Sequence, residues 1–519
     1  MRPARLLLIN PQVCKPHNAR LPLSLLTLAA ALEGRHRYRI VDANLDRQPV
    51  TTASRVIARE GVDAIGITVM PGPQLVDAVA ISATLRAAHP AIPIIWGGYF
   101  PTLYPNVAIN AAYVDLVVRG EGEETLLELL DRLDDIWPSR KLVDGRLQDG
   151  NPRVLADVRG LTWRRDGSVV HNPPRRPRRD GAWPMLPYEA LGDLTPYHRG
   201  TFLSPRTSVH QAATGCRYHC RFCGVASMYG GATALQDPGR LRQHLLTLRD
   251  RYGVSSMMYY DNNFFDSEET ARPLLEVLAS VPLPYWCYGR ADTLARLSPA
   301  AWQLVQRSGL RMVYIGAESP DDGRLRALGK GGKAAYTLEA AIRCREHGVL
   351  PELSFIVGDP EDPEADIDRT FAFIREVKRR VREAEIVLYF YTPMPQRDPA
   401  AWREAFTGTE VKESRTYGAG GLPLPETPEG WADPRWVRYV CHTDAPWLTP
   451  RLRRRVHDFA RVLSCRFPTA QDIRTPPWGK RLLSMLARWR YTTGLYHYPV
   501  ELSWLHARLR MRVPEAESL

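Results

Sequence analysis

The chain has 519 residues, 44% of them hydrophobic and 24% charged, which is the composition of an ordinary globular protein with room for two or three domains. Eight cysteines are too few for a disulfide framework in a chain of this length, and the absence of any run of about 20 apolar residues excludes a membrane-spanning helix. The formal charge is +12 at pH 7, but none of the usual RNA-binding signatures is present, so we expect no nucleic-acid partner.

Residues 1 to 135 alternate short, fully apolar runs with stretches of helical periodicity. Apolar strands separated by helices predict a parallel sheet covered on both faces, so we expect a doubly wound, Rossmann-like α/β domain. Two of its helices are expected at residues 23–32 and 74–88. Its strands are expected at residues 6–9, 38–41, 64–69, 92–96 and 116–118.

Glycine-rich turns follow the predicted strands of this domain. In an open α/β sheet the ligand binds beyond the carboxyl ends of the strands. Glycine at these ends allows a large planar ligand to approach the backbone closely. The candidate binding residues there are Thr68, Gly97, Gly98, Tyr99, Glu121 and Gly122.

Residues 136 to 204 are expected to form a connector with one possible hairpin at residues 154–170, and we assign them no chemistry. From residue 205 to 395 the alternation resumes with six βα units. This pattern predicts a partial (β/α)6 barrel whose site lies at the carboxyl ends of the strands. These strands are expected at residues 209–213, 256–260, 285–288, 312–315, 353–357 and 386–390.

A cysteine triplet follows the first strand of the predicted barrel. Cys216, Cys220 and Cys223 form a CxxxCxxC run between two glycines. Thiolates are soft ligands that suit zinc or an iron–sulfur centre, and a closed zinc site would need a fourth ligand, for which His219 is available. Three cysteines on one short loop more naturally hold three irons of a [4Fe–4S] cluster and leave the fourth iron open. Because oxidised thiols could not bind iron, we expect a reducing, cytoplasmic location.

With Phe222 directly before the last cysteine and Gly224 directly after it, the loop resembles the signature of the radical S-adenosylmethionine (radical SAM) superfamily. In that family the open iron chelates the amino acid end of SAM, and an electron from the cluster releases a 5′-deoxyadenosyl radical that abstracts hydrogen from the substrate. The resemblance implies that Tyr391 lines the substrate cavity. It implies a SAM site formed by Phe222, Gly224, Asp261, Asn262, Asn263, Arg290, Glu318 and Ser354.

The order of the two predicted domains resembles the cobalamin-dependent radical SAM enzymes, whose N-terminal domain binds cobalamin. The resemblance implies that the glycine-rich strand ends of residues 1 to 135 hold cobalamin. The Asp-x-His-x-x-Gly motif that supplies a histidine to cobalt in other cobalamin proteins is absent, and residues 42–45 are its nearest approach. We therefore expect cobalamin to bind with no histidine below the metal.

Residues 396 to 519 shift to proline, glycine, tryptophan and arginine and then to helical periodicity from about residue 450, so we expect a mostly helical C-terminal region. Arginines alternate with aromatic side chains from residue 480 to residue 512. Such a segment could make peripheral contact with an anionic membrane surface, or it could be a plain packed helical tail.

The resemblance implies a cobalamin-dependent radical SAM methyltransferase that moves a methyl group from SAM via methylcobalamin to an unactivated carbon of a lipid or natural-product substrate. One alternative is an oxidative cyclase or ring-rearranging enzyme of the same architecture. A cobalamin sensor or carrier would not need the three cysteines. A methylthiotransferase is disfavoured because Cys14 is the only cysteine of the first domain. The expected partners are a small-molecule or lipid substrate and a reducing protein such as flavodoxin or ferredoxin.

Overall fold

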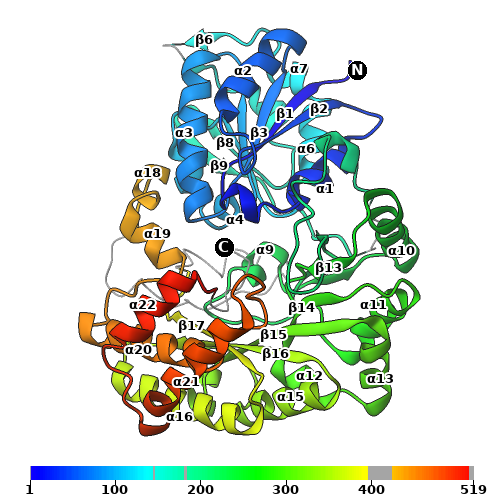
Figure 1. Cartoon of the computed structure of the whole chain (residues 1–519). Helices are drawn as coiled ribbons and strands as arrows, with labels where there is room; N and C mark the ends of the chain where they lie inside the picture. The colour runs from blue at the N-terminus through cyan, green and yellow to red at the C-terminus, as the bar shows by residue number, and fades with distance from the viewer. Residues whose placement is uncertain (1, 144–145, 180–183, 395–423, 513–519) are drawn as a thin grey trace.

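The computed structural model describes residues 2–143, 146–179, 184–394 and 424–512. It contains two large β-sheets flanked by helices, with a helical region beside the second sheet (Figure 1). In the view of Figure 1 the N-terminal sheet lies above the second sheet, and the orange and red C-terminal helices run along one side. The α/β fold class that the sequence predicts is confirmed for both domains.

Five parallel strands form the first part of the N-terminal sheet, whose order is β2-β1-β3-β4-β5 followed by β8 and β9. Alternate residues of β1 enter separate cores: Leu7 and Ile9 pack on one face of the sheet, and Leu6 and Leu8 pack on the other. Burial on both faces explains why the strands are apolar throughout. The strands are β1 (Arg5–Asn10), β2 (Arg37–Asp42), β3 (Ala64–Thr68), β4 (Ile94–Gly97) and β5 (Leu116–Val118).

Helices cover both faces of this sheet. One core includes side chains of α2, α3 and α5, and the other includes side chains of α1, α6 and α7. The expected helices at residues 23–32 and 74–88 are α1 and α3, within one residue at each end. The helices are α1 (Leu23–Leu32), α2 (Pro49–Glu60), α3 (Pro73–Ala88), α4 (Tyr99–Leu103), α5 (Pro105–Asn110), α6 (Glu123–Asp131) and α7 (Leu133–Ile136).

A hairpin from the predicted connector extends the first sheet. Strands β8 (Leu161–Arg165) and β9 (Ser168–His171) form the hairpin, and β8 pairs antiparallel with β5, so the sheet is mixed. The buried guanidinium of Arg119 donates to the carbonyl of Leu161 at 3.2 Å. The connector also contains α8 (Pro152–Leu155) and a small hairpin of β6 (Leu142–Val143) and β7 (Arg146–Leu147). The domain boundaries that we drew at residues 135 and 204 stay predictions.

The second sheet has the six parallel strands that the sequence predicts, in the order β10-β13-β14-β15-β16-β17. Helices α10 (Pro238–Leu246), α11 (Glu268–Ser280), α13 (Pro299–Ser308), α15 (Ala334–Glu346) and α16 (Pro363–Arg380) contribute to its large core. The strands are β10 (Thr207–His210), β13 (Ser256–Tyr259), β14 (Tyr285–Arg290), β15 (Leu310–Glu318), β16 (Leu350–Val357) and β17 (Glu385–Phe390).

The first strand of this sheet is shorter than expected. It ends at His210, and residues 213–215 instead form a separate strand, β11 (Ala213–Gly215), which pairs antiparallel with β12 (Thr233–Leu235). Two side chains at the end of β13 hold β11 in this position, since Asp261 accepts from the Ala213 N–H at 2.5 Å and Asn262 accepts from the Gly215 N–H at 3.0 Å. The cysteine run therefore starts from a small hairpin rather than from the main sheet.

The C-terminal helices bind both domains together. Trp431 of α18 (Pro428–Trp431) and Trp436 of α19 (Pro434–Val440) enter a core of the first domain, whereas Phe459 of α20 (Pro450–Arg466) stacks on Phe371 of α16 with ring centroids 3.7 Å apart. Helices α21 (Pro477–Thr493) and α22 (Val500–Leu509) pack against α20. Within the described residues, no helix combines the length and apolarity that crossing a membrane requires.

Candidate active site

The cysteine run occupies the loop between β11 and α9 (Val225–Tyr229). Gly215, which precedes the first cysteine, has a φ of +77°, and a Cβ there would lie 2.0 Å from the carbonyl oxygen of Ala232. Glycine is therefore required at this position on both conformational and steric grounds. Within the loop the Cys223 N–H donates to the Cys220 carbonyl at 3.0 Å, which makes a tight turn between these two cysteines.

The three thiols are electrostatic neighbours on this loop. Burial raises the pKa of Cys216, and it raises the pKa of Cys223 to about 12, with further contributions from the other cysteines of the run. In the described part of the chain, no three His, Cys, Asp or Glu side chains converge tightly enough to form a metal-holding group. The donor set itself, three soft sulfurs on one loop, suits an iron–sulfur cluster, and iron binding would replace the thiol protons.

The carboxyl end of β13 braces the cysteine loop. Asp261 is fully buried, its Oδ2 has no hydrogen-bond partner, and burial raises its pKa to about 7. Asn263 lies closer to the thiols, since its Nδ2 is 3.9 Å from the Cys216 Sγ and donates to Asp266 at 3.0 Å. The buried Oδ1 of Asn263 has no partner. Of the residues predicted to bind SAM here, Asp261 and Asn262 hold the hairpin, and Asn263 keeps an acceptor free for a ligand.

Two buried cations stand beside the cysteine loop. The Arg290 guanidinium carbon lies 3.5 Å from the centre of the Tyr218 ring, and Arg290 donates to Asp292 at 2.9 Å. Lys330 donates to Glu318 at 2.6 Å. Burial lowers the pKa of Lys330, but Glu318 and Cys220 raise it by more, so the ammonium stays charged. Positive charge at this place favours bound anions, including thiolates and a carboxylate.

Lys330 is a site residue that the sequence analysis missed. It lies in a Gly329-Lys330-Gly331 turn 12 residues after Glu318, and this turn was the only signal that could have found it. Glu318 has a φ of +60°, next to a register shift between β15 and β16. A strained backbone at a buried carboxylate is typical of a functional position.

The remaining predicted residues lie around the same strand ends. Ser354 is buried on β16 and hydrogen-bonds the Tyr314 hydroxyl, and Phe222 is half-buried on the cysteine loop. Tyr391 follows β17, where the Arg324 guanidinium carbon lies 4.3 Å from its ring centre and Trp447 lies 6.0 Å away. Tyr391 is therefore enclosed by side chains at the end of the last strand.

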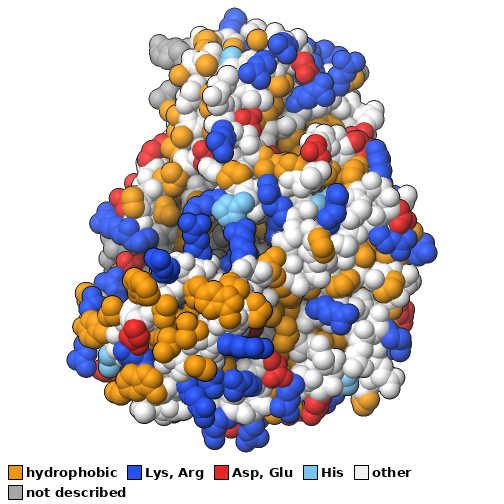
Figure 2. All heavy atoms as spheres, viewed as in Figure 1, with side chains coloured by type: hydrophobic (Ala, Val, Ile, Leu, Met, Phe, Trp, Pro, Cys, Tyr) orange, Lys and Arg blue, Asp and Glu red, His pale blue; other side chains and the backbone are white. Residues whose placement is uncertain are grey.

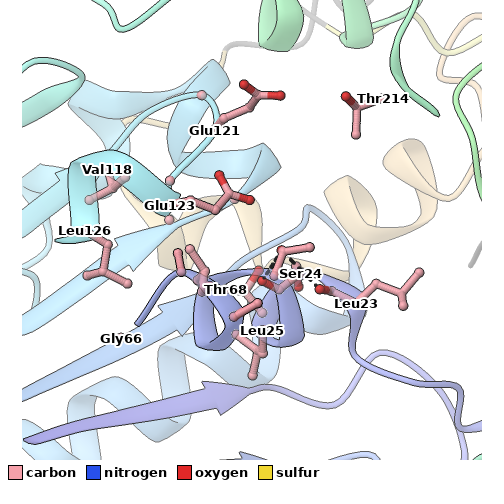
Figure 3. A pocket seen from close by; sticks show the side chains of 18 of the residues that line it. Leu23, Ser24, Leu25, Gly66, Thr68, Val118, Glu121, Glu123, Leu126 and Thr214 are labelled. Carbon is pink, nitrogen blue, oxygen red and sulfur yellow. Dashed lines mark hydrogen bonds between the residues drawn. The ribbon is translucent and has the colours of Figure 1, made fainter. Parts of the chain in front are cut away.

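A cavity of about 220 Å³ opens at the carboxyl ends of the first sheet (Figure 3). Its inner wall is apolar and lies between the sheet and helices α1 and α6, as the labelled side chains of Leu25, Val118 and Leu126 show. A Cβ on Gly66 would lie 3.1 Å from Leu8, so glycine on β3 keeps the floor of this cavity open. Five of the predicted cobalamin-binding residues line the cavity: Thr68, Gly97, Gly98, Glu121 and Gly122.

Two carboxylates stand at the mouth of this cavity. Burial raises the pKa of Glu121 to about 7 and raises the pKa of Glu123 as well. Glu121 also accepts from the Arg178 N–H at 2.7 Å. Carboxyl groups of this kind can hydrogen-bond the amide side chains of a corrin ring, so the residues present fit cobalamin.

The second domain completes the same cavity. Thr214, Tyr229 and Gln236 line it, and Figure 3 shows Thr214 facing the two glutamates across the opening. Thr214 is two residues before Cys216. The remaining predicted cobalamin residue, Tyr99, does not line this cavity; its hydroxyl meets Gly224, where a Cβ would lie 2.1 Å from it. Tyr99 thus ties the first domain to the cysteine loop.

A larger cavity of about 920 Å³ follows β17, the last strand of the second sheet. It runs from Lys378 and Glu385, at one end of the strand, to Phe390 and His442 at the other, and it reaches Val13 of the first domain. Gln471 lies under the barrel and donates to Glu352 at 2.6 Å and to Glu385 at 3.1 Å. This space lies beside the strand that precedes Tyr391.

Comparisons with known proteins agree with this arrangement. The B12 binding domain family matches residues 17–130, and the radical SAM superfamily matches residues 211–374. An uncharacterized methyltransferase of Pyrococcus horikoshii is 23% identical over 69% of this chain and 73% of its own length. An anaerobic magnesium-protoporphyrin IX monomethyl ester cyclase of Synechocystis is 25% identical over 54% of this chain, which spans only 53% of that relative's length.

Among solved structures, the radical SAM methyltransferase TsrM of Kitasatospora setae, with cobalamin and a [4Fe–4S] cluster bound, aligns with a TM-score of 0.62 at 18% identity and covers 94% of this chain and 99% of its own. A likeness at this identity shows a shared fold. The two family matches identify a protein whose cofactors are cobalamin, SAM and a [4Fe–4S] cluster. The chain thus combines a B12-binding domain with a radical SAM core that follows it.

Proposed function

We propose that the protein is a cobalamin-dependent radical SAM methyltransferase that acts on an unactivated carbon of a lipid or natural-product substrate. One observation carries the proposal: Thr214, two residues before the cysteine run, faces the glutamates of the B12-binding domain across a single cavity. When bound, the cluster with SAM would supply a hydrogen-abstracting radical and cobalamin would supply the methyl group. The relatives include both a methyltransferase and a cyclase. We therefore propose methyl transfer, rather than ring closure, as the reaction.

In this proposal the side chains around the cysteine loop position the reactants. Cys216, Cys220 and Cys223 hold the cluster, and the free acceptor of Asn263 and the carboxylate of Glu318 receive polar groups of SAM. Phe222, Gly224 and Ser354 would complete the SAM site, with Arg290 and Lys330 neutralising its carboxylate. The residues that line the smaller cavity, from Thr68 to Gly122, would hold cobalamin. Tyr391 would border the substrate.

The test uses SAM that carries a trideuterated methyl group. Protein reconstituted anaerobically with iron, sulfide and cobalamin is mixed with this SAM and a strong reductant, which supplies the electrons for cob(I)alamin and for the cluster. The cobalamin is then extracted and analysed by mass spectrometry. A methyltransferase labels its cobalamin before any substrate is known. A cyclase or ring-rearranging enzyme would cleave SAM to 5′-deoxyadenosine without labelling cobalamin, and this result would reject methyl transfer.

Substitution of the three cysteines with alanine separates an enzyme from a cobalamin sensor or carrier. The triple variant of an enzyme loses the cluster and all SAM cleavage, because no other cysteine lies on this loop. A sensor or carrier would keep its cobalamin-dependent behaviour.

We also propose that a flavodoxin or ferredoxin reduces the cluster. The exposed Arg217 on the cysteine loop offers a cationic contact for such an acidic partner.

A further inference from the structure

Helices α21 and α22 expose an unusual amount of apolar surface. Of the 13 large hydrophobic side chains that are exposed in the described part of the chain, 10 lie between residues 473 and 504. Figure 2 shows orange side chains gathered over the C-terminal helices, with blue side chains beside them. The ten are Ile473, Trp478, Leu482, Met485, Leu486, Trp489, Leu495, Tyr498, Val500 and Trp504, and we call them the apolar face.

The apolar face of α21 is a continuous stripe along one side of the helix. Trp478, Leu482, Met485 and Trp489 are spaced by four, three and four residues, which puts them in one line on a helix with 3.6 residues per turn. The opposite side of α21 carries Gly479, Leu483 and Ala487, which are buried against the protein. The helix is therefore apolar on two sides, and only one of them is covered.

Arginines border this stripe. At 100° per residue, Arg481 and Arg488 fall together on one flank of the exposed line. Both are exposed, as is Arg508 on α22, and no carboxylate in the described residues lies within 4.0 Å of these three guanidinium groups. Residues 473–512 hold eight Lys or Arg residues and a single acidic residue, Glu501. Glu501 is bound by Arg490 at 2.5 Å, so the arginines at the border of the stripe are left without a counter-charge.

We propose that α21 and α22 form a docking surface for an anionic lipid bilayer. A helix with an apolar stripe, tryptophans and basic flanks lies in the plane of the interface, where its apolar side enters the acyl region and its arginines meet acidic headgroups. Tryptophan and tyrosine are the side chains that prefer this boundary. A second copy of the chain fits less well, because a two-fold symmetric contact would place the unpaired arginines of both copies opposite one another.

Docking would also orient the larger cavity. Ser484 of α21 lines that cavity and donates to the Arg466 carbonyl at 2.8 Å, on the arginine side of the stripe. The larger cavity would thus lie behind α21, on the side of the helix that turns away from the exposed stripe. The docking surface itself rests on exposure and charge alone, so it stands whether or not the proposed methyl transfer is correct.

The test is flotation of the full-length protein, reconstituted with iron, sulfide and cobalamin, with vesicles of equal parts phosphatidylglycerol and phosphatidylcholine. We expect the protein to float with these vesicles, to float at least tenfold more weakly with pure phosphatidylcholine, and to be released by salt. Tryptophan fluorescence should be quenched by brominated lipid. Failure to float, or equal binding to both vesicle types, would overturn the proposal.

Two matched pairs of variants assign the binding to this surface. Substitution of Arg481, Arg488 and Arg508 with glutamine should weaken binding at least tenfold, since each basic residue near an anionic surface contributes about fivefold. The same change at the exposed Arg242, Arg251 and Arg307 alters the net charge equally and should change binding less than threefold. Equal effects of the two triple variants would show unspecific attraction and would overturn the proposal.

The second pair removes apolar side chains. Leu482→Ser with Val500→Ser should weaken flotation at least fivefold, whereas Val76→Ser with Leu142→Ser makes the same chemical change on exposed side chains elsewhere and should leave it unchanged. All four substituted side chains are exposed, so the melting temperatures should match the wild type. Light scattering tests whether a second copy of the chain covers the apolar face instead. A dimer that does not float, and that Leu482→Ser with Val500→Ser disrupts, would overturn the proposal and assign the surface to a second copy.

Discussion

Substitution of Gly215 is the most direct test of the structure of the cysteine loop, because a control glycine is available for the same change. In Gly215→Ala the new methyl group would lie 2.0 Å from the Ala232 carbonyl oxygen, on a backbone with a φ of +77°. Gly192 has a similar φ of +69°, but a Cβ there meets nothing within 4 Å. Both alanine variants place a Cβ on a backbone with positive φ, and only Gly215→Ala also meets a backbone carbonyl oxygen.

The expected magnitudes follow from these contacts. A positive φ costs alanine about 1–2 kcal/mol, so both variants should lose at least this much free energy of unfolding. Gly215→Ala must also break pairing of β11 with β12, which joins three residue pairs. At about 1 kcal/mol for each hydrogen bond, this raises its total loss to roughly 3–5 kcal/mol. The displaced hairpin carries Cys216 away from the other two cysteines.

The assay is iron content and the electron paramagnetic resonance signal after anaerobic reconstitution, with urea unfolding measured in parallel. We expect Gly192→Ala to take up iron as the wild type does, and Gly215→Ala to take up less than a fifth of that amount. A Gly215→Ala protein with a full cluster and the stability of the Gly192 variant would refute the role of this glycine.

Three further predictions concern the braces and the cavities. Burial raises the pKa of Asp261 to about 7, so between pH 4 and 7 the folded state holds a proton that the unfolded state has lost. The contribution of Asp261 to stability should therefore fall by about 2–4 kcal/mol as pH rises from 4 to 7, and Asp261→Asn should reduce the pH dependence of urea unfolding by this amount. An Asn variant with the wild-type slope would contradict this. Lys330→Met leaves the buried Glu318 carboxylate without its cation, so the free energy of unfolding should fall by about 3 kcal/mol. Calorimetry should show SAM binding at least tenfold weaker. Lys333→Met, at an exposed lysine, should change neither quantity. Leu28→Trp fills the smaller cavity and should abolish cobalamin retention while iron uptake persists. Leu127→Trp, on α6 but outside the cavity, should retain cobalamin. Retention by both variants would show that cobalamin does not bind in this cavity.

The local parts of the fold could be predicted because each strand is an uninterrupted apolar run. The six strands of the barrel and the five parallel strands of the first domain were found in this way. The pairing of β8 with β5 could not be predicted, since residues 161–165 show only a generic hairpin pattern. The separate hairpin that follows the early end of β10 likewise depends on hydrogen bonds that Asp261 and Asn262 accept, and these residues lie more than 45 residues away in the sequence.

The candidate site also has a part that the sequence predicts and a part that it does not. The cysteine spacing and the glycine-rich strand ends are short patterns that point to their chemistry directly. The contacts of Lys330 with Glu318 and of Tyr99 with Gly224 depend on how the chain folds, and the sequence around these residues does not predict such pairs. The apolar stripe of α21 was visible only as an aromatic, basic segment until the structure showed which side of the helix is covered.

The central claim is that the cysteine loop and the B12-binding domain act in one cavity as a radical enzyme. The most direct measurement is iron, cobalamin and 5′-deoxyadenosine on the same anaerobically reconstituted, reduced sample. The account predicts about four irons and one cobalamin for each chain, with 5′-deoxyadenosine formed from SAM. A protein that binds cobalamin but assembles no cluster and cleaves no SAM would contradict it.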